Sequence, residues 1–104
     1  MPYKLEYLPA ARQDILDMVR YVSTQLQNPS AAARLAERLV AAAENARRMP
    51  YAHPAYLPLR PLRHAYRRIL VGQYLLFYWV TEETQTITVA RVLYAKRDLP
   101  RLPD

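Results

Sequence analysis

The sequence contains no cysteine, one glycine and two histidines. Because cysteine is missing, the chain has no disulfide framework, no thiolate zinc site and no cysteine nucleophile. His53 and His64 are the only imidazoles, so a metal site would consist largely of carboxylates, and the spacing of the acidic residues indicates none. We expect neither a metal nor any other cofactor.

Long apolar runs are missing too. No stretch approaches the roughly 18 uninterrupted apolar residues of a membrane helix, and residues 1–7 lack the basic start, apolar run and cleavage site of a secretory signal. We therefore expect a cytoplasmic protein with no membrane partner. With 104 residues, 52% of them hydrophobic, the chain suits one compact core. The prediction is a single domain over residues 1–104.

Acidic residues are absent from one long part of this basic chain. The formal net charge is +6, and no Asp or Glu lies between Asn45 and Thr81. Clustered guanidinium groups repel one another unless an anion is nearby, and their planar forks suit phosphate or carboxylate. A solubilising basic face is the alternative. We predict that an anionic partner contacts the arginines of this window, which are Arg47, Arg48, Arg60, Arg63, Arg67 and Arg68.

The N-terminal half predicts a strand and two helices. Residues 3–8 alternate bulky apolar with charged side chains, as a half-buried strand does. Apolar residues then recur every three or four positions from Pro9 to about Gln27, which predicts an amphipathic helix. Asn28-Pro29 is a typical helix start, and small residues follow on one stripe of a second helix that should end near residue 48. The two helices should form an αα-hairpin.

The C-terminal half predicts three strands. Four prolines between residues 50 and 61 favour an extended loop. Residues 66–71, 74–80 and 86–94 are rich in β-branched and aromatic residues, and the single glycine, Gly72, stands where a two-residue hairpin turn needs positive φ. The order βααβββ predicts an α+β domain in which an antiparallel sheet is packed on one face by the αα-hairpin.

Several motifs, taken in order, resemble the RelE/ParE family of toxins from bacterial type II toxin-antitoxin systems. They include Ala-x-x-Asp-Ile at residues 11–15, Asn28-Pro29 at the second helix, Tyr66-Arg67-Arg68, and Arg91-Val92-Leu93-Tyr94 at the end of the last strand. The resemblance implies the toxin fold and a cognate antitoxin as partner. It also implies that operator DNA is bound only through the antitoxin complex, and that the arginines of the acid-free window contact the target or the antitoxin.

The family contains two activities. RelE-like members cleave messenger RNA in the ribosomal A site without a metal, and ParE-like members poison DNA gyrase. Metal-free cleavage needs a base, an acid and cations around the phosphate. If the chain is such a nuclease, the resemblance implies as catalytic candidates Arg67, Arg68, Arg91, Tyr94, Lys96 and Arg97, with His64 a weaker one.

Two departures favour the ParE-like activity. The nucleases commonly carry an arginine where this chain has Leu75, and some carry a histidine where it has Tyr94. Tyrosine is a poor base near neutral pH. In addition, adjacent strand residues point to opposite faces, so at most one of Arg67 and Arg68 reaches the face away from the helices. We expect a gyrase poison neutralised by its antitoxin. A ribosome-dependent mRNA endonuclease and a non-toxic co-repressor are the alternatives.

Overall fold

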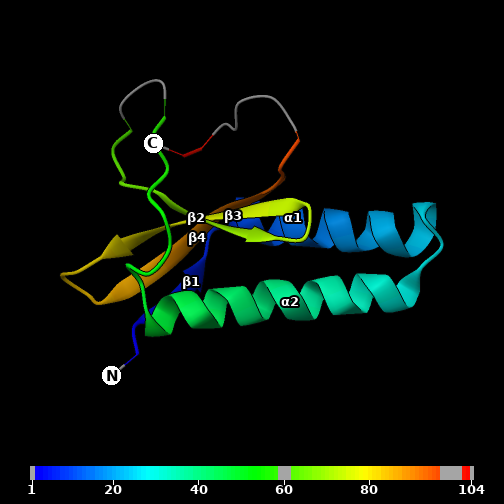
Figure 1. Ribbon diagram of the computed structural model, residues 1–104, viewed down its shortest axis with the longest axis horizontal. Coiled ribbons are helices and arrows are strands. Elements are labelled where there is room, and N and C mark those ends of the chain that lie inside the picture. Colours follow the sequence, from blue (N-terminus) through cyan, green and yellow to red (C-terminus); the bar gives the residue numbers. More distant parts are fainter. Residues whose placement is uncertain (1, 59–61, 97–101, 104) are drawn as a thin grey trace.

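The computed structural model describes residues 2–58, 62–96 and 102–103. The long helices lie beside a twisted sheet (Figure 1). The predicted α+β class and element order are confirmed. In chain order the elements are β1 (Lys4–Tyr7), α1 (Pro9–Arg20), η1 (Tyr21–Gln25), α2 (Pro29–Arg48), β2 (Arg67–Val71), β3 (Tyr74–Thr81) and β4 (Thr86–Tyr94).

The sheet has the strand order β1-β4-β3-β2. Its last three strands are antiparallel neighbours, as predicted. β1 instead pairs parallel with β4, with Lys4 opposite Thr86, so the sheet is mixed and the expectation of a wholly antiparallel sheet is wrong for this strand. The alternation in residues 3–8 defines which side chains are buried, but it carries no information on the direction of the partner strand.

The helix ends follow the expected local chemistry. Asn28 caps α2, because its Oδ1 accepts a hydrogen bond from the backbone N–H of Ala31 at 3.2 Å, and Pro29 occupies the first turn. The first helix is predicted to reach residue 27. In the structure α1 continues as one π-helical segment, η1, to Gln25, and Gln27 then adopts a φ of 49° that turns the chain into α2. No helix in the described ranges is long and apolar enough to cross a membrane.

The main core lies between the helix pair and the sheet. Small residues on the predicted stripe of α2, Ala43 and Ala46, are fully buried there and allow close approach of the helix. Large side chains from the three C-terminal strands fill the space, among them Leu76, Tyr78, Ile87, Val89 and Val92. The predicted αα-hairpin therefore packs on one face of the sheet.

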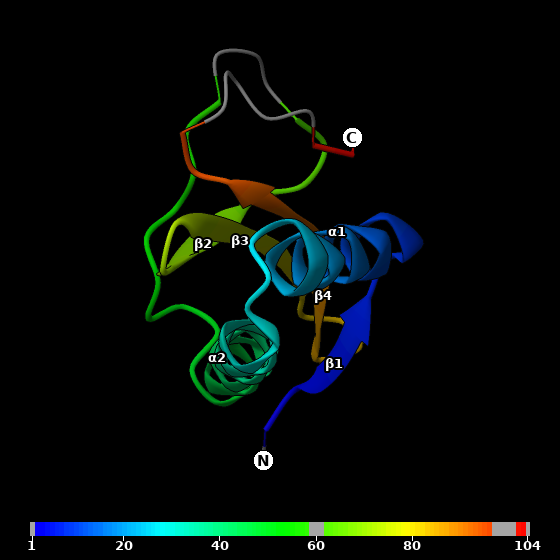
Figure 2. The ribbon, with the colours of Figure 1, turned by 90° about the vertical axis from the view of Figure 1, so that its right-hand side faces the viewer.

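The opposite face of the sheet is partly covered as well. The segment after α2 runs past the β2 edge to that side (Figure 2). It is held along β2 by a bridge between Ala55 and Arg67, and by a hydrogen bond from the N–H of Tyr56 to the carbonyl of Tyr66 at 2.8 Å. A second apolar cluster forms there from Tyr66, Phe77 and Ala90, with Tyr56, Leu62, Trp79 and Leu102 packed against it.

Candidate functional site

One end of the sheet face away from the helices has a row of three leucines. Leu70 of β2 lies opposite Leu75 of β3, and Leu75 lies opposite Leu93 of β4. Leu70 is 66% exposed, whereas Leu75 and Leu93 are half-buried. Three strands therefore present apolar side chains together beside the turn at Gly72, and we call these three residues the leucine row.

The next row along the same face combines arginine with a buried aromatic ring. Arg68 lies opposite Phe77, and Phe77 lies opposite Arg91. Neighbouring strands are about 4.8 Å apart, so the two arginine backbones are separated by about 10 Å. Arg68 is exposed on this face. We call the leucine row together with Arg68 and Arg91 the distal sheet face.

Arg91 is bound to a carboxylate of α1. Its Nε and Nη2 donate to Asp14 at 2.7 and 2.9 Å, and Oδ2 of Asp14 also accepts the backbone N–H of Val92 at 3.0 Å. The hydrogen bond with Asp14 raises the pKa of the Arg91 guanidinium. Asp14 therefore provides an acceptor for a backbone N–H of β4 beyond the point where its pairing with β1 ends. The negative charge of Asp14 also balances the positive charge of Arg91. The sequence singled out Asp14 only as part of the Ala-x-x-Asp-Ile motif, without a role.

Arg67 points to the other face of β2, as the strand alternation predicts. Its Nη1 donates to the backbone carbonyl of His53 at 2.7 Å, and its guanidinium carbon lies 5.0 Å from the centre of the Tyr51 ring. These contacts hold the segment that follows α2 against the start of β2. Of the two adjacent arginines, Arg68 is therefore the one available on the distal sheet face.

His64 packs in an aromatic group at the covered end of the same face. Its ring is stacked on Trp79, with centroids 3.7 Å apart and planes 3° apart, and Tyr66 meets both rings edge-on. The hydroxyl of Tyr66 donates to the carbonyl of Pro103. Stacking of this kind accounts for the position of His64 without any catalytic role.

Tyr94 and Lys96 lie at the end of β4. Tyr94 alternates with Leu93 and so faces the helix side, where its hydroxyl donates to Oε1 of Gln73 at 3.1 Å and its ring meets Tyr74 edge-on at 5.8 Å. Lys96 is exposed, two residues beyond the strand. Arg63 is exposed before β2. The candidates Arg60 and Arg97 lie outside the described residues.

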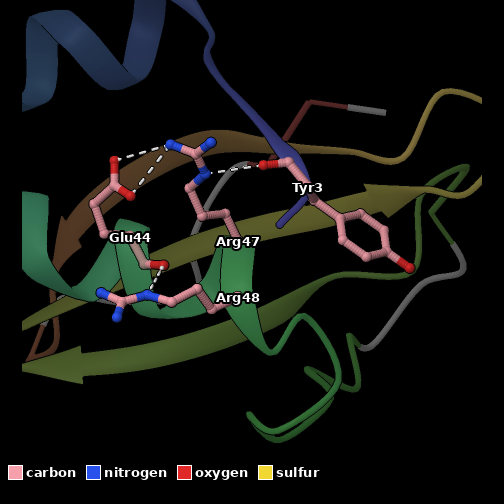
Figure 3. Close-up of polar contacts among 4 residues, drawn as sticks. All are labelled: Tyr3, Glu44, Arg47 and Arg48. Carbon is pink, nitrogen blue, oxygen red and sulfur yellow. Dashed lines mark hydrogen bonds and ion pairs between the residues drawn. The ribbon is translucent and has the colours of Figure 1, made fainter. Parts of the chain in front are cut away.

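Arg47 and Arg48 lie at the C-terminal end of α2, next to the start of β1 (Figure 3). Nε of Arg47 donates to the backbone carbonyl of Tyr3 at 2.9 Å, and its Nη1 lies 3.3 Å from a carboxylate oxygen of Glu44. Nε of Arg48 donates to the backbone carbonyl of Glu44 at 3.4 Å. Arg47 therefore ties α2 to the start of β1. Those of the predicted basic residues that the structure describes do not converge on one site.

The distal sheet face suits binding better than proton transfer. It offers the exposed guanidinium of Arg68, the guanidinium of Arg91 paired with Asp14, and the leucine row. Strand cleavage by a 2′-hydroxyl needs a positioned base and acid, and the imidazole nearest this face is stacked on Trp79. In the described part of the chain, no three or more His, Cys, Asp or Glu residues gather as a metal site would require.

Residues 5–99 match the model of a protein family described as the ParE toxin of the type II toxin-antitoxin system parDE. The chain belongs to this ParE toxin family. No curated protein sequence matches it significantly.

Solved structures share the fold of this ParE-family chain at low sequence identity. The ParDE system of P. aeruginosa has a TM-score of 0.73 at 12% identity, covering 90% of this chain and 97% of that one. The RelBE2 complex of Mycobacterium tuberculosis has a TM-score of 0.65 at 22% identity, covering 90% and 99%. The archaeal RelE-RelB complex of Pyrococcus horikoshii OT3 has a TM-score of 0.63 at 13% identity, covering 93% and 99%. At these identities the likeness shows the fold alone.

Glu82 joins three separate parts of this ParE-family fold. One of its carboxylate oxygens accepts the hydroxyl of Tyr3 at 2.7 Å, and the other accepts the hydroxyl of Tyr51 at 2.5 Å. The hydrogen bond with Glu82 raises the pKa of Tyr51 to about 12 and also raises the pKa of Tyr3. The same two hydrogen bonds lower the pKa of Glu82, and the bond from Tyr51 has the larger effect. We call Tyr3, Tyr51 and Glu82 the carboxylate clamp.

The carboxylate clamp predicts a pH-dependent contribution to stability. The pKa of Glu82 is lowered on folding, so its contribution is present above the unfolded value of 4.5 and is lost as the pH falls below it. The pKa of Tyr51 is raised, so its contribution is present below 10.0 and is lost as the pH rises towards about 12. We expect Tyr51→Phe to lower the melting temperature most at intermediate pH, with the difference from the unsubstituted protein shrinking at both extremes.

The measurement is a series of thermal melts across these pH values for both proteins. Tyr21→Phe is the control, because it removes an exposed hydroxyl on the helix pair. A melting-temperature difference for Tyr51→Phe that does not change with pH would contradict the titrating clamp.

Proposed function

We propose that this chain is a ParE-like toxin that stops growth by binding and poisoning DNA gyrase. The leucine row carries the proposal: Leu75 stands in its centre, at the position where the resemblance implies arginine in the nucleases. An apolar row beside an exposed Arg68 suits contact with a protein surface, because burial of leucine drives association and arginine adds directed hydrogen bonds. The family match to ParE over residues 5–99 supports the part of the proposal that makes this chain a toxin.

A cognate antitoxin is the second part of the proposal. The similar RelBE2 structure is described as a toxin-antitoxin complex, and the similar archaeal structure as a complex of RelE with RelB. The acid-free window from Asn45 to Thr81 favours an acidic partner segment that orders on binding. The complex acts in the cytoplasm and binds operator DNA only through the antitoxin.

Induced expression in a bacterial host, with replication and translation measured separately, tests the proposed target. We expect incorporation of labelled thymidine to stop before incorporation of labelled methionine, together with a rise in the SOS response. Purified toxin should also increase DNA cleavage complexes of gyrase in vitro. Co-expression of the neighbouring antitoxin gene is the control and should restore growth.

Two other results would reverse the assignment. Rapid cleavage of ribosome-bound transcripts, with chromosomal replication intact, would identify a RelE-like endonuclease. Arg68 and Lys96 would then be its first candidate site residues. Normal growth under strong expression of folded toxin would indicate a member whose only role is in the antitoxin complex.

A further inference from the structure

The segment after α2 is fastened to the sheet by groups that keep their protons in neutral and mildly acidic solution. We call residues 50–56 the covering segment. The carbonyl of Pro50 accepts the hydroxyl of Tyr78 at 2.6 Å, and the carbonyl of Pro54 accepts the N–H of Arg68 at 3.1 Å. Burial raises the pKa of Tyr78 to about 12, so this hydroxyl stays protonated.

The carboxylate clamp holds the covering segment as well, and it is also constant near neutral pH. The hydrogen bonds from Tyr51 and Tyr3 hold the pKa of Glu82 below its ordinary value of 4.5, and the pKa of Tyr51 is about 12. Between about pH 5 and pH 8, histidine is the side chain that ordinarily changes its charge. The covering segment contains one histidine, His53.

The imidazole of His53 is surrounded by groups from three other elements. Its ring is half-buried and meets the ring of Tyr78 of β3 edge-on, with centroids 6.2 Å apart. The backbone carbonyl of His53 accepts Nη1 of Arg67 of β2 at 2.7 Å, which fixes that guanidinium close to the imidazole. On the side of α2, the ring lines a groove of about 330 Å³ together with Arg38 and Asn45.

The charged groups around His53 are therefore two arginines, one from α2 and one from β2. Within the described residues, no acidic side chain lines the groove, and the sequence has no Asp or Glu from Asn45 to Thr81. A positive charge on the imidazole would lie beside Arg67, partly removed from water and without a carboxylate to balance it. Burial and the charge of Arg67 accordingly lower the pKa of His53.

Closing of the covering segment is therefore linked to the protonation of His53. In the closed state the pKa of His53 is lowered, whereas in an open segment the ring lies in water and regains its ordinary value of 6.5. Below pH 6.5 the open state thus binds more protons than the closed state. The contribution of His53 to closing is complete above pH 6.5 and is lost as the pH falls towards the lowered pKa.

The covering segment hides part of the distal sheet face. The ring of Tyr56 packs edge-on against Phe77, with centroids 5.2 Å apart. Phe77 lies between Arg68 and Arg91 in its row and is buried. When Tyr56 moves away, part of an aromatic ring between two guanidinium groups becomes accessible, which enlarges the surface open to a partner.

We infer that the covering segment is a pH-sensitive part of the fold, which stays closed over Phe77 while the His53 ring is neutral and opens more readily when that ring is protonated. Opening breaks the backbone hydrogen bonds between the covering segment and residues 66–68 and leaves the rest of the sheet paired. The inference goes beyond the proposed function and holds for either target of the toxin.

Amide hydrogen exchange of the full-length toxin, measured by NMR between about pH 7.5 and pH 5, tests this opening. Two amides report it, that of Tyr56, which donates to the carbonyl of Tyr66 at 2.8 Å, and that of Arg68. Protection is the intrinsic exchange rate at each pH divided by the measured rate, so the pH dependence of the chemical step cancels. We expect the protection of both amides to fall roughly threefold or more towards acid pH, while the amides of β4 keep theirs.

The two histidines of the chain provide matched variants. His53→Gln carries no charge at any pH, so the protection of both reporting amides should no longer depend on pH. His53→Phe should behave in the same way while keeping a ring against Tyr78. His64→Gln removes the other imidazole, which is stacked on Trp79, and should retain the fall in protection.

Three results would overturn the inference. Protection that is independent of pH in the unsubstituted toxin would show that protonation does not open the covering segment. The same fall in both His53 variants would assign it to another group. An equal fall in the amides of β4 would mean that the whole fold is lost rather than one segment opened. None of these results bears on gyrase poisoning, which the growth and cleavage assays test separately.

Discussion

Replacing Leu76 with alanine should lower the free energy of unfolding by about 2–5 kcal/mol, because truncating a buried leucine leaves a cavity. Leu76 is 0% exposed and lies between Ile69 and Val92 in the centre of the sheet. A loss of this size is a large part of the stability of a small domain. Growth inhibition should disappear together with the cooperative thermal transition.

Arg68→Ala is the comparison that separates function from folding. Arg68 is exposed and its backbone, not its side chain, bonds to the covering segment. Truncation should cost at most about 1 kcal/mol, as exposed charges usually do, and growth inhibition should fall while the melt stays intact. The same is expected of Lys96→Ala. Full toxicity in both stable variants would mean that these cations are only solvated, and that the site lies on the helix pair.

Arg67→Ala is a less informative variant than its neighbour. Its guanidinium bonds to the carbonyl of His53 and lies over Tyr51, so truncation should remove about 1.5–3 kcal/mol, the usual range for a hydrogen bond from a charged group. A loss of toxicity in this variant has to be judged against its thermal melt before it is assigned to target binding.

Asp14→Ala should lower the free energy of unfolding by about 2–3 kcal/mol, because it leaves a guanidinium and a backbone N–H without their acceptor. The side chains of Arg91 and Asp14 are 26% and 14% exposed, so part of the charge interaction is screened by solvent. Urea unfolding of Asp14→Ala, Arg91→Met and the double variant gives the coupling between the two residues.

Asp17→Ala is the matched control on the same helix. Asp17 is exposed and accepts one hydrogen bond, from Gln13 at 2.8 Å, so its loss should change stability by less than about 0.5 kcal/mol. A coupling between Asp14 and Arg91 of similar size would show that their pair is no stronger than an ordinary surface contact. Arg91 would then be available for a direct role in binding the target.

The candidate site was foreseen only in part. The sequence identified Leu75 as a departure from the nuclease pattern, and the strand alternation separated Arg67 from Arg68. It assigned no role to Leu70 or Leu93, because an isolated leucine in an apolar strand is indistinguishable from core. Only the cross-strand register shows that both leucines lie beside Leu75 and form a row with it.

Local chemistry in the sequence by itself determined the elements and their ends. Asn28 caps a helix through its own side chain, Gly72 supplies the positive φ of a hairpin turn, and apolar periodicity distinguishes helix from strand. Each of these effects acts between residues a few positions apart. The helix of residues 29–48 and the strand of residues 86–94 therefore have the bounds that their pattern predicts.

Only the tertiary structure decided which distant groups meet. The parallel pairing of β1 with β4 depends on how the helix pair returns the chain to the sheet, and Asp14 reaches Arg91 across 77 positions of sequence. A side-chain pattern specifies which face is buried but not what is buried against it. Contacts between distant residues form only when the whole core has packed, which is why the pairing of Arg91 with Asp14 and the clamp on Glu82 appear only in the folded chain.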